Sequence, residues 1–251
     1  MATITSSGAV NQSITRVGRN EPFNLQVSRS QITGHTNISI FGYQSAVATT
    51  PIAVWENATA YSFPSSASVM TLVSTSGSDT MGVIVNGLNS SFAPISEVVT
   101  LNGTTGVNTV NSFFRINSLI LASGSNAGTI TAKASSVTYA QINVGIGKSQ
   151  NSWYTVPAGY SFYLTRAEVS STLSYAGSVT GLYQVKTTIN PNGPTLNILQ
   201  QPFVGNFIAL RSFPFAYSQQ SDLQFQASVS TGTAGIGIII EGILIANDGT
   251  L

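Results

Sequence analysis

The sequence predicts an all-β protein with two antiparallel β-sandwich or jelly-roll-like domains that follow an extended N-terminal arm. Three observations favour this class. Apolar residues recur with a period of two, not 3.6, over most of the chain. Turn-forming residues separate these runs about every 8–12 residues, and no stretch of about twelve residues offers an amphipathic helix. The chain has 251 residues, of which 42% are hydrophobic, so it can bury a substantial core.

Residues 1–35 are predicted to form the arm, because they are too polar to build a core of their own. They contain three of the nine basic residues of the chain, Arg16, Arg19 and Arg29, and a single acid, Glu21. Arginine binds carboxylates through paired hydrogen bonds. The three arginines are therefore candidate contacts with carboxylates of a partner protein or of an adjacent subunit. The alternative is an arm that folds back on its own β domains.

Strand signals are present in both halves of the chain. In Asp222–Val229 and in Tyr183–Ile189, apolar residues alternate with polar ones, which places one face of a strand in the core. Residues 235–246, GIGIIIEGILIA, are apolar at both parities and are typical of a central strand. In the first half, Arg115 and Asn117 are predicted to lie opposite a core-facing set. That set is Val110, Phe114, Ile116 and Ile120.

Turn chemistry agrees with these strands. Asn102-Gly103 lies between two strand-like runs and is a strong signal for a two-residue hairpin. Residues 156–159, VPAG, place proline and glycine as a type I turn does. Residues 190–194, NPNGP, can only form a loop.

The break between the two β domains is predicted at residues 149–152, which gives domains of 36–150 and 151–251. Just before it, residues 145–149 read GIGKS, like the end of a phosphate-binding loop. The first glycine of that motif would fall on Ile142. The segment that follows holds two aromatic residues and a proline instead of a helix that points at a phosphate. We therefore expect a flexible joint here and no nucleotide site.

Charge is the unusual feature of the composition. Only 7% of residues are charged, against about 25% in an ordinary soluble domain. Such a surface suits a molecule whose faces are covered by neighbours, or one that works in salty water. The net charge of +1 offers no basic field for nucleic acid or for an acidic membrane. The first residues lack the basic and apolar regions of a secretory signal, so we expect no export by that route.

Catalysis, cofactors and metals are not expected. His35 is the only histidine, so a Ser-His-Asp triad would need it, and we interpret it as an exposed or interface residue. The chain has no cysteine, which excludes a thiolate metal site. Its eight acids are scattered without ligand spacing. Two carboxylates suffice for a glycosidase, and the sequence leaves that open, but each acid fits a loop or a strand edge equally well.

Aromatic residues allow one further kind of site, a platform that stacks on sugar rings. Aromatics at strand parity more often lie in a core, and those near a joint often pack two domains together. The platform is therefore the weaker interpretation. The residues concerned are Trp55, Tyr61 and Phe63 in one group, and Trp153, Tyr154, Tyr160 and Tyr163 in the other.

Three short phrases stand out along the chain: S-E-x-V-x-L-N-G-T at Ser96 to Thr104, S-N-A-G-T-I-T at Ser125 to Thr131, and Y-T-V-P-A-G at Tyr154 to Gly159. The region that holds them, about residues 37–170, resembles small virion structural proteins of tailed phages that infect marine hosts such as cyanobacteria. A looser similarity continues to the end of the chain. The phrases mark hairpins and strand starts, and the resemblance implies no catalytic residue.

The resemblance implies a place in a phage particle. With the nearly uncharged surface and the polar arm, it leads us to expect a non-enzymatic protein that decorates or cements the exterior of a phage head after synthesis in the host cytoplasm. The expected partners are the major capsid protein and copies of the chain itself, in a homo-oligomer such as a trimer, with no nucleic acid and no membrane. One alternative is a tail or fibre component that touches a host-surface glycan. Another is an adhesive module of a cell surface, which the missing signal disfavours.

Overall fold

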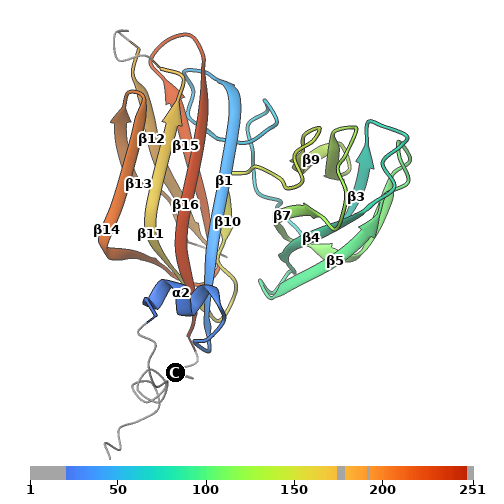
Figure 1. Ribbon diagram of the computed structural model, residues 1–251, viewed down its shortest axis with the longest axis horizontal. Coiled ribbons are helices and arrows are strands. Elements are labelled where there is room, and N and C mark those ends of the chain that lie inside the picture. The colour runs from blue at the N-terminus through green and yellow to red at the C-terminus, as the bar shows by residue number, and fades with distance from the viewer. Residues whose placement is uncertain (1–20, 174–178, 191–192, 248–251) are drawn as a thin grey trace, which may run out of the picture.

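The computed structural model describes residues 21–173, 179–190 and 193–247. Apart from one short helix, its regular elements are β-strands, and the strand pairs are antiparallel. The strands form two β-sandwiches of different size that lie side by side (Figure 1). The predicted all-β class is therefore confirmed.

The larger unit, which we call the main sandwich, packs two sheets face to face around one core. Sheet 1 has the order β1-β16-β11-β14, with bounds His35–Val47, Ala234–Ala246, Tyr160–Ser171 and Asn206–Tyr217. Sheet 2 has the order β10-β15-β12-β13, with bounds Trp153–Thr155, Ser221–Val229, Gly181–Ile189 and Thr195–Phe203. A two-residue strand, β2 (Ile52–Ala53), also pairs with β15.

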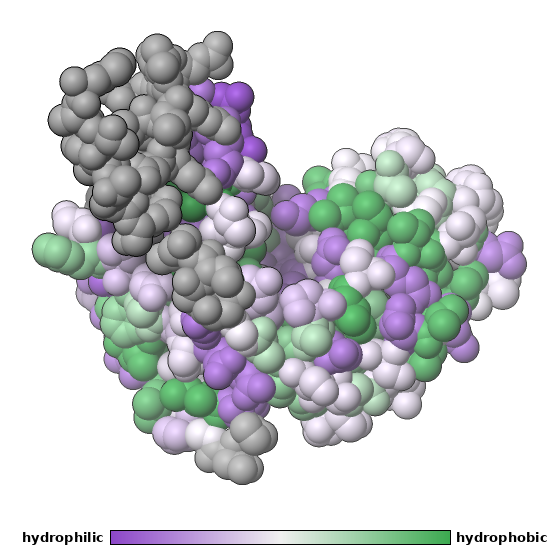
Figure 2. Space-filling view, turned by 90° about the horizontal axis from the view of Figure 1, so that it is seen from below, coloured by the Kyte–Doolittle hydropathy of each residue, from purple (hydrophilic) through white to green (hydrophobic). Residues whose placement is uncertain are grey.

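The smaller unit, which we call the inserted sandwich, contains the seven strands from β3 to β9 and has its own core. Sheet 3 has the order β6-β3-β8-β9, with bounds Val107–Phe113, Ser68–Ser74, Ile130–Ala134 and Val137–Ile142. Sheet 4 has the order β5-β4-β7, with bounds Pro94–Thr100, Gly82–Leu88 and Arg115–Leu121. In Figure 2 the described surface of both units is a patchwork in which hydrophobic residues lie between hydrophilic ones.

The division of the chain differs from the predicted boundary between 36–150 and 151–251. β1 pairs along its length with β16, from His35 opposite Ile245 to Val47 opposite Ala234. Residues 35–55 therefore belong to the main sandwich together with the C-terminal half. Residues 68–142 are inserted between them. The break expected at 149–152 does coincide with the place where the chain returns to the main sandwich. The pairing of β1 joins residues about 200 positions apart, and local periodicity carries no information about such partners.

The strands predicted in the second half are present as β12, β15 and β16. β16 is central, between β1 and β11. β15 is buried on both faces, although its residues alternate between apolar and polar. Its apolar face lies in the main core, and its polar face lies under the segment that leads from β2 to β3, where Gln224 Nε2 donates to the Tyr61 carbonyl oxygen.

The hairpin predicted at Asn102-Gly103 is wrong. β5, which ends before it, and β6, which begins after it, belong to different sheets, so the turn connects two sheets and does not join paired strands. The chain does turn here, since the Thr105 amide donates to the Asn102 carbonyl oxygen at 3.0 Å. Gly103 has a φ of +56°, and a Cβ at this position would lie 2.7 Å from the carbonyl oxygen of Gly77. The positive φ and the close approach of Gly77 explain why glycine occupies position 103.

The predicted core-facing set around β6 and β7 is also wrong in part. Val110 is 89% exposed, whereas Phe113, Arg115 and Ile116 are buried. β6 ends at Phe113 and β7 begins at Arg115 in the other sheet of the sandwich. The alternation of core-facing and outward-facing side chains therefore restarts at residue 114. The face predicted for residues of β6 cannot be extended to residues of β7.

Part of the predicted arm is folded against the main sandwich. Helix α2 (Phe23–Ser28) packs on β1 and buries Val27. Phe23 meets the ring of His35 edge-on, with 5.9 Å between ring centres. Residues 1–20 of the arm lie outside the described residues. Within the described ranges, no helix has both the length and the apolar character that a membrane span requires.

Candidate functional site

The arginines proposed as contacts are placed unequally by the structure. Arg16 and Arg19 lie outside the described residues. Arg29 follows α2, and its Nη1 atom forms an ion pair with Oε1 of Glu21. Arg29 is therefore engaged within its own chain, although about half of its side chain stays accessible to a partner.

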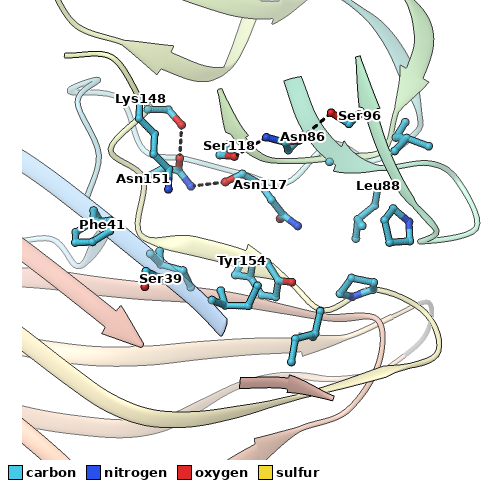
Figure 3. A pocket seen from close by; sticks show the side chains of 18 of the residues that line it. Ser39, Phe41, Asn86, Leu88, Ser96, Asn117, Ser118, Lys148, Asn151 and Tyr154 are labelled. Atoms are coloured by element: carbon cyan, nitrogen blue, oxygen red, sulfur yellow. Dashed lines mark hydrogen bonds between the residues drawn. The ribbon is translucent and has the colours of Figure 1, made fainter. Parts of the chain in front are cut away.

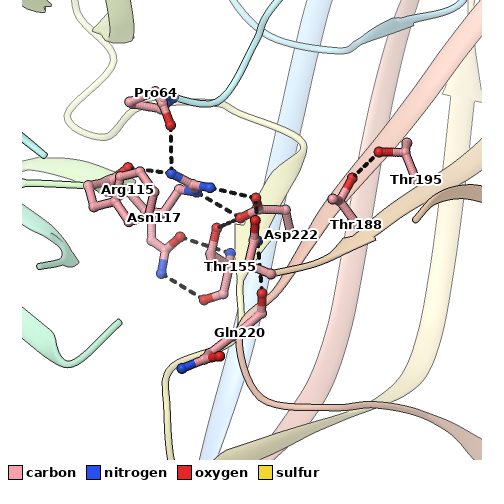
Figure 4. Close-up of polar contacts among 10 residues, drawn as sticks. Pro64, Arg115, Asn117, Thr155, Thr188, Thr195, Gln220 and Asp222 are labelled. Carbon is pink, nitrogen blue, oxygen red and sulfur yellow. Dashed lines mark hydrogen bonds and ion pairs between the residues drawn. The ribbon is translucent and has the colours of Figure 1, made fainter. Parts of the chain in front are cut away.

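The two sandwiches are joined by a buried ion pair (Figure 4). Arg115 begins β7 of the inserted sandwich, and Asp222 lies at the start of β15 in the main sandwich. Arg115 donates from Nε to one carboxylate oxygen at 2.8 Å and from Nη2 to the other at 2.7 Å. The two side chains are 4% and 3% exposed. This two-point geometry is the strong form of an arginine–carboxylate contact.

The other polar atoms of this pair are satisfied as well. Burying two charges costs much free energy of desolvation, and the cost is offset only when the remaining hydrogen-bonding positions are filled. The Arg115 guanidinium also lies over the Phe114 ring, 4.0 Å from its centre. The additional donors to Asp222 are Thr155 Oγ1 and Asn190 Nδ2, and the additional acceptors for Arg115 are the carbonyl oxygens of Pro64 and Phe114.

A second polar contact fixes β7 against β10. The Thr155 amide donates to Oδ1 of Asn117 at 3.0 Å, and Nδ2 of Asn117 donates to the Thr155 carbonyl oxygen at 3.3 Å. Next to it, Nε1 of Trp153 donates to the Ile116 carbonyl oxygen at 3.0 Å. Backbone and side chains of both sandwiches thus interlock, and the relative position of the two units is held by directional bonds.

The joint expected to be flexible is exposed at residues 145–147, but its continuation, with Ser149, Asn151 and Ser152, is buried and hydrogen-bonded. Ser149 Oγ accepts from the Leu119 amide at 3.0 Å. Ser152 Oγ accepts from the Val54 amide at 2.7 Å and donates to the Phe225 carbonyl oxygen at 2.6 Å. The element after GIGKS is β10, a strand, so no helix N-terminus points toward Lys148. The described geometry therefore lacks what a Walker A phosphate site requires.

The aromatic residues at the joint pack the two units together. Trp55, Tyr61 and Trp153 form a buried cluster, in which the rings of Tyr61 and Trp153 stack with 3.6 Å between their centres. Tyr154 is buried in the main core beside Phe162. The sequence left open a sugar platform built from these residues. The structure contradicts it for the buried members, because their ring faces are covered by protein.

A cleft of about 600 Å³ separates the two sandwiches (Figure 3). It is lined by β1 on one side and by β4, β5 and β7 on the other, with Lys148 as the charged residue among its lining. The ammonium group of Lys148 lies 5.7 Å from the centre of the Phe41 ring. Two of the amide side chains that line the cleft are committed to the protein: Asn86 donates to Ser118, and Asn151 donates to the Asn117 carbonyl oxygen.

Two titratable groups near the joint are shifted by their surroundings. Burial raises the pKa of Glu56 from an ordinary value of 4.5 to about 7, although amide hydrogen bonds from Gln150 and Asn143 act to lower it. Burial lowers the pKa of Lys148. Each shift follows from the loss of water around a charged form. The pKa values of both groups therefore depend on how closely the two sandwiches are packed.

Two of the three sequence phrases that carry the resemblance meet at Asp79. The amides of Ala127 and Gly128 donate to its carboxylate at 2.8 and 2.9 Å, and the Gly103 amide donates to its carbonyl oxygen at 2.9 Å. Desolvation raises the pKa of Asp79, but the hydrogen bonds from Ser74 Oγ and from the amides of Ala127 and Gly128 outweigh it, so the pKa is lowered. The third phrase contains Thr155 of the junction. All three phrases therefore mark structural contacts.

Nothing in the described residues assembles into a metal centre: no group of three or more His, Asp or Glu side chains lies close enough to hold an ion. Sequence reasoning missed the Arg115–Asp222 pair. One signal for it was present. Arg115 follows two phenylalanines and precedes an apolar run, which indicates burial. A buried arginine is seldom without an acidic partner. The sequence does not say which acid that is.

Comparisons with known proteins show neither a family nor a function for this chain. The chain matches no protein-family model and no curated protein. One similar solved structure is titled "Structure of infectious bursal disease virus Gt strain". The similarity covers 91% of this chain and 79% of that chain, at 10% sequence identity and a TM-score of 0.24. A TM-score of this size carries no argument about the fold or the function.

Proposed function

We propose that the protein is a non-enzymatic structural component of a phage particle, which decorates or cements the exterior of the head through contacts with the major capsid protein and with copies of itself. The observation that carries this proposal is how few charged groups the protein offers to water. A lone soluble protein usually depends on a mixed charged surface. A protein that is covered by neighbours does not need one.

The few charges of the described residues are largely engaged within the chain. Arg115 and Asp222 are buried together, and Arg166 is shared by Glu168 and Glu241. The carboxylates of Asp79 and Glu97 accept backbone hydrogen bonds: Asp79 from Ala127 and Gly128, Glu97 from Val110 and Asn111. What remains accessible is mostly Ser, Thr, Asn, Gly and apolar surface.

The interlocked junction supports the same role. Two sandwiches held by the Arg115–Asp222 pair and by the cluster around Trp153 form a rigid body that presents its surfaces in a fixed relation. On a symmetric shell, many weak contacts of a rigid subunit add up to a large total because each copy repeats them. The resemblance of residues 37–170 to phage virion proteins agrees with this role.

The copy number of the protein in purified phage particles tests the proposal. Quantitative mass spectrometry should find it in the head at a number on the order of hundreds, as expected for a component that follows the symmetry of the shell. About six or twelve copies would place it in the tail, where closed rotational symmetry sets the number. That result would overturn head decoration in favour of the tail or fibre alternative. Absence from the particle would overturn both.

A further inference from the structure

The outer face of sheet 1 carries large apolar side chains, among a few charged ones, where such a sheet normally meets water. In β16, Ile238 and Ile240 lie in the main core. Ile239, Ile243 and Ile245 alternate with the core residues of this strand and therefore point to the other side. A strand that is apolar on both faces is typical of sheets covered on both sides. Within the described part of the chain, α2 covers one end of this face, and Ser39 and Phe41 at its β1 edge border the cleft toward the inserted sandwich.

The cross-strand register extends this face over all four strands. Residues directly opposite each other in neighbouring strands point to the same side of a sheet. Ile208 is 54% exposed and Leu210 is 75% exposed, and exposed apolar patches of this kind mark interaction surfaces. The two central rows of the face are Phe41, Ile239, Glu168 and Ile208, and Ser39, Glu241, Arg166 and Leu210.

The cluster of Arg166, Glu168 and Glu241 at the centre of the face carries a net negative charge, whereas the ammonium group of Lys148 lies at the β1 edge of the face, 5.7 Å from the centre of the Phe41 ring. Arg166 forms an ion pair with Glu168 and another, at 3.1 Å, with Glu241. One arginine between two carboxylates leaves one negative charge in excess, in a chain that has eight acids in all. Two such faces brought together across a twofold axis would oppose like charges. An occupant that combines apolar side chains with positive charge would therefore match both the apolar residues of this face and the excess carboxylate at its centre.

Residues 1–20 of the chain have that composition. They contain Arg16 and Arg19, no Asp and no Glu, and the apolar residues Ile4, Val10, Ile14 and Val17. Twenty residues span up to about 66 Å when extended, which exceeds the roughly 44 Å of a thirteen-residue strand. The segment precedes α2, which already packs at one end of this face.

We propose that residues 1–20 of a neighbouring copy lie across the outer face of sheet 1, with Arg16 and Arg19 against the carboxylates of Glu168 and Glu241. This inference rests on the proposed function, since it takes copies of the protein to be neighbours. It names the surface through which one copy would hold the next. The excess carboxylate on the face would then be paired, and the outer side of β16 would be covered.

Site-specific cross-linking tests the inference cleanly, because the chain has no cysteine. The purified full-length Ser13→Cys variant is mixed with a size-tagged Ile208→Cys variant and oxidised. We expect a disulfide-linked dimer of the two different chains. The matched control replaces Ile208→Cys by Leu196→Cys, which is 46% exposed but lies on β13 of sheet 2. This control should give no dimer above background.

The charge pattern provides a second measurement. Glu168→Gln combined with Glu241→Gln in the receiving chain should lower the yield of the dimer by roughly three- to tenfold, the size expected for exposed charge contacts. Glu97→Gln, in the inserted sandwich, should leave the yield unchanged. A single chain that carries both Ser13→Cys and Ile208→Cys should remain largely uncross-linked at low concentration.

Three results would overturn the inference. The first is an equal yield of the cross-linked dimer for Ile208→Cys and Leu196→Cys. The second is a dimer yield that Glu168→Gln and Glu241→Gln leave unchanged. The third is a disulfide that forms only within one chain. None of these changes the number of copies in a particle. A failure here therefore stays distinct from a failure of the proposed function.

Discussion

Arg115 and Asp222 form two parallel hydrogen bonds, at 2.8 and 2.7 Å, although they are 107 positions apart and belong to different sandwiches. The pair lies where β7 of the inserted sandwich begins beside the first residues of β15. Each sandwich therefore holds a buried charge that only the other sandwich neutralises. The stability of the two units is linked through this contact.

Asp222→Asn should lower the free energy of unfolding by about 3–5 kcal/mol, because it leaves the Arg115 guanidinium buried without a counter-charge. Urea unfolding of the full-length protein measures the change. Glu241→Gln is the matched control, since it breaks a partly exposed contact with Arg166 and should cost less than about 1 kcal/mol. Equal costs for the two variants would contradict the assignment of Arg115–Asp222 as the central contact.

Three glycine-to-alanine variants separate backbone strain from close contact. Gly103 has a positive φ and a Cβ there would meet the Gly77 backbone, Gly145 has a positive φ in open space, and Gly147 has neither constraint. We expect Gly103→Ala to cost the most, since a shift of the Gly77 backbone adds to strain of about 1–3 kcal/mol. Gly145→Ala should cost about 1 kcal/mol, and Gly147→Ala should be neutral or slightly stabilising. Melting temperatures in the reverse order would refute this interpretation.

Because of Glu56, the free energy of unfolding should fall as the pH rises from about 5 to 8. Burial raises its pKa to about 7, so between pH 4.5 and 7 the folded state binds a proton that the unfolded state has released. That contribution is present at pH 5 and is lost as pH rises through 7. Because Glu56 is only partly buried, we expect about 1–2 kcal/mol, roughly half the value for full burial.

Glu56→Gln should remove most of this slope, measured as unfolding free energy against pH. Glu97 is the control with the opposite sign. Desolvation raises its pKa, but hydrogen bonds from Val110 and Asn111 lower it by more, so its contribution is present at neutral pH and is lost only as pH falls below about 4.5. Glu97→Gln should therefore keep the slope between pH 5 and 8. A wild-type slope in Glu56→Gln would show that another group causes the effect.

Deleting residues 2–20 should leave the folded core intact, because the three core clusters are built from residues 38–244. Deleting residues 2–30 also removes Val27, which is buried, and should cost about 1–3 kcal/mol from the apolar surface exposed at β1.

We expect both deletions to abolish binding to phage heads. Full occupancy of heads by the shorter deletion would mean that the sandwiches carry the attachment.

Lys148→Met tests whether GIGKS binds a nucleotide. The residues after it form β10, so we expect the wild type to show no saturable binding of Mg-ATP by calorimetry. The variant should be as stable as the wild type or more so, because it removes a partly desolvated ammonium group. Saturable binding that disappears in Lys148→Met would overturn the structural interpretation of this loop.

Local patterns in the sequence predict the strands well where a run of consecutive residues stays within one strand of one sheet. β12, β15 and β16 are such cases. The type I turn predicted at residues 156–159 lies one residue later, because the Tyr160 amide donates to the Pro157 carbonyl oxygen and Gly159 takes a central position with a φ of +79°. The prediction fails where the chain changes sheets, as between Phe113 and Arg115, because side-chain parity is defined only within one strand.

The site could not be predicted in the same way. Asp222 sits in a run of alternating residues whose polar side should face water, and it is buried because a segment more than 150 residues earlier covers β15. The partner of Arg115 and the partner of β1 both depend on such distant contacts. Neither spacing nor composition encodes them, so the sequence predicted the class of fold but placed the domain boundary wrongly.

The insertion of one sandwich within the other has a consequence for the order of synthesis. All strands of the inserted sandwich lie within residues 68–142, so it can fold as soon as that region leaves the ribosome. β1 waits for β16, about 190 residues later, which takes roughly 10–40 s at ordinary translation rates. During that interval its apolar side has no native partner, and Arg115 is still without Asp222. The protein is therefore expected to fold from its middle outward, and β1 and β16 must pair last to close the larger unit.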